Sequence, residues 1–252
     1  MRIKKAVVAL LLLSIPGLAL ADLRVGATRV VHDGGSTAPS NLRIHNIGKT
    51  VSLIQVWLDE GQRDAALENL RTPYVATPAL FRLEAGKNRD IQVRPVDASK
   101  LPADRESLLW LNILDVPART KGDDAAPLEF AMRWRLKIFH RPTGLQGNAA
   151  SAPYKLHWSM HVDGEGHPAL RADNPSPYFV SLSKVVLGGR EVPLEADRAQ
   201  VPPLGKLHLR VDPSHPAEGP LGLQLTWLDD NGIEHTTAAE VSRPMIETNL
   251  PR

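Results

Sequence analysis

The alternation of apolar and polar side chains over short runs is the feature that most constrains the fold of this chain. In "MRWRLKIF", Met132, Trp134, Leu136 and Ile138 share one parity and three cations share the other. A period of two residues indicates a strand with one apolar and one basic face. Similar runs recur between turn signals, among them "NLRIHNIG", "VSLIQVWLDE" and "KLHLRVD". No segment has a helical period of useful length, so the sequence predicts an all-β protein built as sandwiches or barrels.

A stretch without strand periodicity divides the chain in two. "TGLQGNAASAP" is rich in Gly, Ala, Ser and Pro and follows a long strand directly. We therefore predict a first domain over residues 22–141, a linker over 142–147 and a second all-β domain over 148–252. In the second domain, "DDNG" between two apolar runs predicts a hairpin, because Asn-Gly tolerates positive φ.

The first 21 residues have the pattern of a secretory signal peptide. A basic start precedes the apolar run 6–13, and Ala19 and Ala21 form a small-x-small cleavage site. The apolar run is too short to span a bilayer as a stable helix, and no later segment approaches the roughly 20 apolar residues of a span. We predict that residues 1–21 are removed and that the rest is exported; an uncleaved anchor is the alternative.

Composition excludes several classes of function. The 252 residues contain no cysteine, which rules out thiol catalysis and cysteine metal sites. A chain of this length can bury a sufficient core without disulfides. The net charge of +2 is too small to indicate a nucleic-acid partner.

The sequence carries no recognisable catalytic or metal motif. There is no Gly-x-Ser-x-Gly elbow, no phosphate-binding glycine loop and no evident carboxylate pair. His157 and His161 have helical metal-site spacing, but their segment alternates like a strand, which would place them about 13 Å apart. "DDNG" lacks the alternating oxygens of a calcium loop. We expect no enzyme activity, no cofactor and no metal.

Five ordered motifs resemble the periplasmic pilus-assembly chaperones of the chaperone–usher pathway. "LPADRESLLWLNILDVPA", residues 101–118, is similar to the signature of that family, and "TRVVHDG", "VATPALFRLEAG", "LKIFHRP" and "NPSPYFVSL" agree in order. The resemblance implies two immunoglobulin-like sandwiches arranged as a boomerang. It further implies a periplasmic protein that binds pilus subunits, one at a time, and delivers them to an outer-membrane usher, with no covalent step. An exported adhesin or structural pilus component is the alternative; it would need an N-terminal donor extension, whereas the first predicted strand follows Ala21 almost directly.

The resemblance also implies roles for individual residues. In the family, an arginine in the first strand and a lysine in Lys-x-Phe-x-Arg-Pro anchor the carboxylate at the C-terminus of the pilus subunit. They fall on Arg29 and Lys137. Charge-assisted hydrogen bonds from two cations suit a carboxylate, and a fixed chain end sets the register of the residues before it.

The alternating residues ahead of the lysine correspond to the donor strand of the family. Leu128, Phe130 and Met132 would enter the groove left by the missing strand of the pilus subunit. Trp134 stands where we expect a smaller or polar residue, and Leu136 and Ile138 are expected in the core of the chaperone itself. A free donor edge also predicts self-association of the partner-free protein.

The remaining charged residues divide into two groups. Glu106, Arg141 and Asp230 resemble the interdomain ion cluster of the family, with Asp229 as the rival for the last place. Arg133 and Arg135 are interpreted as solvated cations that steer an acidic partner.

Overall fold

The structure, a computed structural model, describes residues 22–118, 130–162, 165, 167–195, 197–212 and 222–242. The predicted signal peptide and Leu128 lie outside these residues. The first domain is a sandwich of two sheets with strand orders β1-β3-β7-β5 and β2-β9-β8-β4-β6. Its strands are β1 Leu23–Val25, β2 Arg29–Asp33, β3 Ser40–Asn46, β4 Ser52–Asp59, β5 Tyr74–Thr77, β6 Leu80–Leu83, β7 Asn88–Pro95, β8 Ser107–Pro117 and β9 Met132–Arg141.

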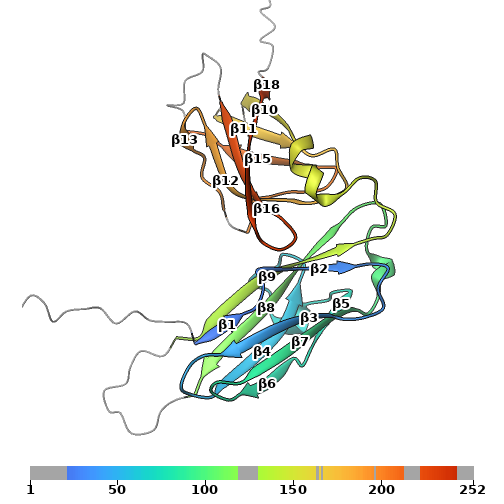
Figure 1. Ribbon diagram of the computed structural model, residues 1–252, viewed down its shortest axis with the longest axis vertical. Coiled ribbons are helices and arrows are strands. Elements are labelled where there is room, and N and C mark those ends of the chain that lie inside the picture. The colour runs from blue at the N-terminus through green and yellow to red at the C-terminus, as the bar shows by residue number, and fades with distance from the viewer. Residues whose placement is uncertain are drawn as a thin grey trace, which may run out of the picture.

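The first segment of the chain is shared between the two sheets of this domain. β1 pairs antiparallel with β3, whereas β2 pairs parallel with β9. Gly26 lies at the crossing, where a Cβ would approach the Arg43 carbonyl oxygen to 2.9 Å. β2 and the end of β9 lie at the edge of the first domain that is next to the second domain (Figure 1).

The second domain repeats the sandwich architecture. Its sheets have the orders β15-β11-β10-β18 and β13-β12-β16-β17, and β14 also pairs with β12. The helix η3, Ala149–Lys155, leads into it. Its strands are β10 His157–Val162, β11 Pro168–Asp173, β12 Val180–Leu187, β13 Arg190–Glu191, β14 Gln200–Val201, β15 Lys206–Arg210, β16 Leu223–Leu228, β17 Glu234–Ala239 and β18 Val241–Ser242.

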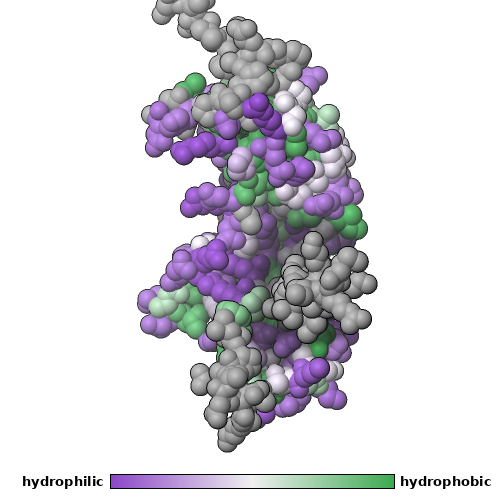
Figure 2. Space-filling model, turned by 90° about the vertical axis from the view of Figure 1, so that its left-hand side faces the viewer, coloured by the Kyte–Doolittle hydropathy of each residue, from purple (hydrophilic) through white to green (hydrophobic). Residues whose placement is uncertain are grey.

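Local sequence explains why these strands form. The β16–β17 hairpin turns at 229–232, where Gly232 adopts a φ of +79°. The apolar parity of β9 faces the first core, with Leu136 and Ile138 4% and 0% exposed. Each domain has its own cluster of buried apolar residues. The face of the molecule shown in Figure 2 is mainly hydrophilic over both domains, with separate apolar patches.

Candidate functional site

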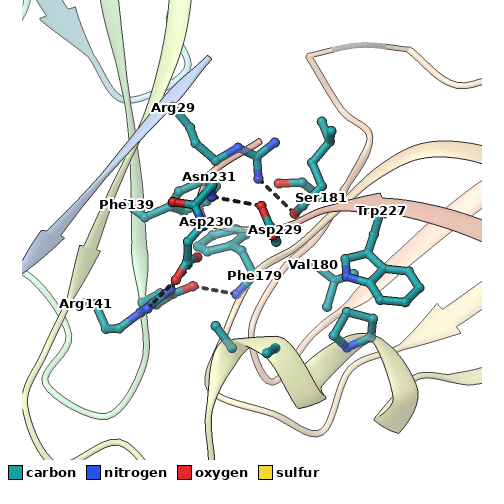
Figure 3. Close-up of a pocket in the computed structure, with 15 residues that line it drawn as sticks. Arg29, Phe139, Arg141, Phe179, Val180, Ser181, Trp227, Asp229, Asp230 and Asn231 are labelled. Carbon is teal, nitrogen blue, oxygen red and sulfur yellow. Dashed lines mark hydrogen bonds and ion pairs between the residues drawn. The ribbon is translucent and has the colours of Figure 1, made fainter. Parts of the chain in front are cut away.

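Arg29 and Lys137 are brought together by strand pairing. They are register partners in the parallel pairing of β2 with β9, and neighbouring strands lie about 4.8 Å apart. The guanidinium of Arg29 faces the second domain, where Nη1 donates to the Leu228 carbonyl oxygen at 3.1 Å (Figure 3). Arg29 is only 7% exposed, and its Nε has no partner among the described residues. The site therefore holds a buried cation with an unused donor.

Lys137 lies beside it in a protein environment that disfavours its charge. Burial lowers the pKa of Lys137 to about 8, and the positive charge of Arg29 acts in the same direction, whereas Asp197 opposes the change. Its ammonium lies 5.6 Å from the centre of the Trp110 ring. Because these two adjacent cations are partly desolvated, binding of an anion between them lowers the electrostatic energy of the site.

Lys137→Met is expected to remove a pH dependence of stability. The pKa of Lys137 is about 8 in the folded protein and 10.5 in its ordinary state, so the unfolded chain binds more protons between these values. The free energy of unfolding therefore rises with pH through this window. Below it, the buried charge costs on the order of 2 kcal/mol, after allowance for partial exposure.

Urea denaturation of both proteins near pH 7 and near pH 10 checks this expectation. The methionine variant should be the more stable protein at the lower pH, and its advantage should shrink at the higher pH. An advantage that does not change with pH would contradict it.

A cavity of about 190 Å³ opens between the domains beside Arg29. The labelled side chains in Figure 3 come from both domains and surround it. Phe139 and Phe179 form an apolar wall, with ring centres 5.6 Å apart. The cavity provides open space next to the arginine, where a small anionic group could reach its guanidinium.

Glu106, Arg141 and Asp230 are in direct contact across the domain junction. Arg141 Nε donates to Glu106 Oε1 at 2.6 Å, and its two Nη atoms donate to the Asp230 carboxylate at 2.8 and 2.9 Å. The backbone N–H of Phe179 donates to Glu106 Oε2 at 2.7 Å. Burial raises the pKa of Glu106, against the opposing effect of Arg141. Such a network sets the geometry of the junction more than its stability.

Asp229 makes different contacts from Asp230. Its Oδ1 accepts the backbone N–H groups of Asn231 and Ile233, each at 2.9 Å, and its Oδ2 lies 3.0 Å from His235 Nε2. It thus shapes the β16–β17 turn, which presents Asp230 to Arg141. Between the two rivals, the geometry favours Asp230 as the member of the interdomain cluster.

The two described members of the predicted donor segment are exposed. Phe130 and Met132 are 61% and 43% exposed, and Met132 begins β9. Trp134 is half-buried and packs against the first core, so its bulk is accommodated inside the first domain. The apolar parity of β9 therefore runs from the core at Ile138 to an exposed end at Met132.

Arg135 is not the solvated cation expected from the sequence, and Arg133, although partly exposed, is hydrogen-bonded within the first domain. The Arg135 side chain is 11% exposed, and its Nη2 donates at 2.7 Å to Asp59 Oδ1, a fully buried carboxylate. Its guanidinium lies 4.2 Å from the centre of the Trp110 ring. Arg133 donates to Asn112 Oδ1 at 3.0 and 2.8 Å. These partners come from β4 and β8, so no local pattern in β9 could have revealed them.

Both halves of the chain match models of known protein families. Residues 22–146 match the family described as "Pili and flagellar-assembly chaperone, PapD N-terminal domain". Residues 151–239 match "Pili assembly chaperone PapD, C-terminal domain". The chain belongs to the pilus-assembly chaperone family.

Similar chaperones span most of this chain. The probable fimbrial chaperone YadV of Escherichia coli K12 is 36% identical over 70% of this chain and 73% of its own length. The chaperone protein FimB/FhaD of Bordetella pertussis is 34% identical over 71% of this chain and 73% of its own.

Solved chaperone structures have the same two-domain fold. The YadV chaperone has a TM-score of 0.72 at 29% identity, covering 87% of this chain and 100% of that chain. The Pseudomonas aeruginosa CupB2 chaperone has a TM-score of 0.69 at 30% identity, with the same coverage. The Salmonella enterica SafB chaperone, solved in complex with the SafA pilin, has a TM-score of 0.69 at 25% identity, covering 88% and 97%.

These comparisons confirm the family predicted from the five motifs and the fold class of two all-β sandwiches. The family consists of chaperones rather than enzymes.

Within the part of the chain that the structure describes, no helix is long and apolar enough to cross a membrane. Those residues also contain no group of three or more His, Cys, Asp or Glu that could hold a metal. His161 contacts His208 on β15, at 2.9 Å between ring nitrogens.

Proposed function

We propose that this chaperone holds a pilus subunit by its C-terminal carboxylate, between Arg29 and Lys137, while the segment at the start of β9 completes the fold of that subunit. The observation that carries the proposal is the direct register pairing of these two cations at the domain junction, where Arg29 also lines a cavity. A carboxylate accepts several hydrogen bonds and would relieve the repulsion between them. The SafB chaperone, which was solved with a pilin, supports the same class of partner for this chain.

The edge of β9 supports strand donation. β2 pairs only with Lys137–Arg141, so residues 132–136 pair with β8 alone among the described strands. Their other edge presents backbone N–H and C=O groups that an extended partner strand can pair with. The anchor begins where this free edge ends, which would fix the register of the added strand.

The exposed apolar side chains supply the specificity of the donor segment. Burying Phe130 and Met132 in a groove would contribute about 1.5–3 kcal/mol each before ordering costs. Leu128, two residues before Phe130, would add a third apolar contact with this groove. In the free protein Phe130 and Met132 are available, because the core of the first domain ends at Trp134.

Family membership supports a proposal for the compartment and for the onward partner. The pattern of residues 1–21 supports export, and the related SfaE protein is described as a periplasmic chaperone. We place this chain in the periplasm and expect it to pass its pilus subunit to an outer-membrane usher. The alternative of an adhesin or structural pilus component is disfavoured, since both domains match chaperone profiles.

Co-expression with a panel of pilus subunits tests the proposal. At least one tagged subunit should be recovered in an equimolar complex with the chaperone. A variant of that subunit with extra residues after its natural C-terminus should not be retained. Its terminal carboxylate would be displaced from Arg29 and Lys137. Equal retention of the extended protein, or no complex across the panel, would refute the proposal.

The same free edge predicts self-association of the partner-free chaperone. Sedimentation velocity over a wide concentration range should show reversible dimers that disappear when a peptide from a pilus subunit is added. Because unpaired edge strands template pairing with a second chain, the dimer should also weaken when Met132 is replaced by lysine. A strict monomer at every concentration would count against this expectation.

A further inference from the structure

On one face of β9, the side chains that follow Arg133 contact the second domain. Four alternate residues of this face each have a partner there, and the partners come from three separate segments. The pairs are Arg135 with Asp197, Lys137 with Gln200, Phe139 with Phe179, and Arg141 with Asp230. The anchor lysine is therefore held between two interdomain ion clusters, of which the Asp197 cluster has no counterpart in the predictions from sequence.

Asp197 and Gln200 connect Lys137 to this second cluster. With its amide oxygen toward Lys137, Gln200 accepts a hydrogen bond from the ammonium and donates from its nitrogen to the Asp197 carbonyl oxygen at 3.0 Å. This is the orientation that satisfies both ends of the amide. Asp197 Oδ2 accepts from Arg135 Nη1 at 2.9 Å and from Arg63 Nη1 at 3.3 Å. A continuous chain of contacts thus links the anchor lysine to two arginines of the first domain.

We propose that Asp197 is a positioning residue for the carboxylate anchor: by tying the loop before β14 to Arg135, it holds the Gln200 amide against Lys137. This inference rests on the proposed function. An ammonium has three N–H donors, and the contact with Gln200 uses one, so the amide orients Lys137 without closing the site to a carboxylate. The side chain then meets its ligand already ordered, which reduces the entropic cost of binding.

The first-domain end of the network keeps its other contacts when Asp197 is replaced. Arg135 remains paired with the buried Asp59 and stacked on Trp110, and Asp59 Oδ2 also accepts from Asn112 Nδ2 at 2.7 Å. Asp197 is instead 38% exposed. Its removal therefore leaves no buried charge unpaired among these described residues, and the variant should fold.

The charges around Lys137 predict how its pKa changes when the charge of Asp197 is removed. Burial and Arg29 on β2 disfavour the ammonium, and Asp197 favours it. The ammonium lies over the Trp110 ring on β8, and Arg135 is the next cation on the same face of β9. Loss of the Asp197 charge therefore lowers the pKa of Lys137 below about 8. More of the lysine would then be neutral in mildly alkaline solution, and a carboxylate would bind less tightly there.

Asp197→Asn tests this role, with Glu195→Gln as the matched control. Glu195 lies in the same loop and carries the same charge, but its side chain is 74% exposed and pairs with Arg198 of that loop rather than with the first domain. Two readouts are taken. The first is the titration of Lys137, followed by NMR of ¹³C-labelled lysine and assigned by its loss in Lys137→Met. The second is the affinity for a peptide with the C-terminal sequence of a pilus subunit, as free acid and as amide.

We expect Asp197→Asn to lower the pKa of Lys137 and to weaken binding of the free-acid peptide about tenfold, with the loss growing as pH rises through the titration. Glu195→Gln should change neither quantity, and Asp197→Glu should restore both in part. An unchanged Lys137 titration in Asp197→Asn, or an equal change in Glu195→Gln, would overturn the inference. If the parent protein binds no such peptide, the proposed function fails, whereas the titration still decides the role of Asp197.

Discussion

Replacing Arg29 or Lys137 with alanine is expected to reduce the affinity for a pilus subunit by at least about 100-fold while leaving the two-domain fold intact. Each residue would contribute charge-assisted hydrogen bonds to one desolvated carboxylate, and removal of one partner from such a contact costs about 2–5 kcal/mol. The fold should tolerate both changes. Arg29 donates a hydrogen bond to a backbone carbonyl, that of Leu228, and burial already lowers the pKa of both cations.

The two substitutions should not be additive. Because both cations would hold the same carboxylate, the double variant should bind little worse than either single variant. An amidated peptide should bind the parent protein weakly and should be insensitive to all three variants. Isothermal titration calorimetry with free-acid and amidated peptides from the C-terminus of a pilus subunit measures these affinities.

Arg94→Ala is the matched control for this prediction. Arg94 is an exposed cation on β7, in the sheet that does not carry the two anchor residues. Its loss changes the net charge equally but should leave affinity unchanged. Parent-like affinity in Lys137→Ala, or a uniform loss that includes Arg94→Ala, would contradict a specific carboxylate anchor.

Phe130→Asp is expected to weaken binding of the pilus subunit by about 100-fold. The substitution removes an apolar contact worth about 1.5–3 kcal/mol and places a carboxylate in the groove of the partner, where it would have to be desolvated. Because Phe130 is 61% exposed in the free protein, the stability of the chaperone itself should not change. Surface plasmon resonance with an immobilised pilus subunit should show most of the loss in the dissociation rate.

Leu80→Asp is the control for the donor-strand prediction. Leu80 is also 61% exposed and lies on β6, at the opposite edge of the same five-stranded sheet. Leu80→Asp introduces the same charge at a residue of equal exposure, far from the free edge of β9. Strand donation through Phe130 would be rejected if the two aspartate variants bound the pilus subunit equally well.

Local sequence patterns predicted the strands of this chaperone well. The alternation in β9 and the Asn231-Gly232 turn of the β16–β17 hairpin follow from side-chain periodicity and from backbone sterics, which act between near neighbours. The division of the first strand between two sheets was not predicted. At the crossing point Gly26 lies against the Arg43 carbonyl, a contact between distant segments that strand periodicity does not reveal.

The functional residues show the same division. Arg29 and Lys137 were found only because motifs around them resemble a known family, since their pairing joins two strands far apart in the sequence. The prediction that Arg135 is a solvated cation is wrong, because its partners Asp59 and Asp197 lie on another strand and in another domain. Neither of these acidic residues stands in a motif that would have indicated a role.

The sequence by itself determined the all-β class, the two-domain organisation of the family and the positions of the five motifs. These depend on period, turn chemistry and residue identity, all of which are local properties of the chain. Only the tertiary structure decided which cations of β9 are solvated and which are held, that Asp230 rather than Asp229 meets Arg141, and that Lys137 is linked to Asp197 through Gln200. The physical reason is that burial and ion pairing depend on distances between strands and domains, which no single stretch of sequence specifies.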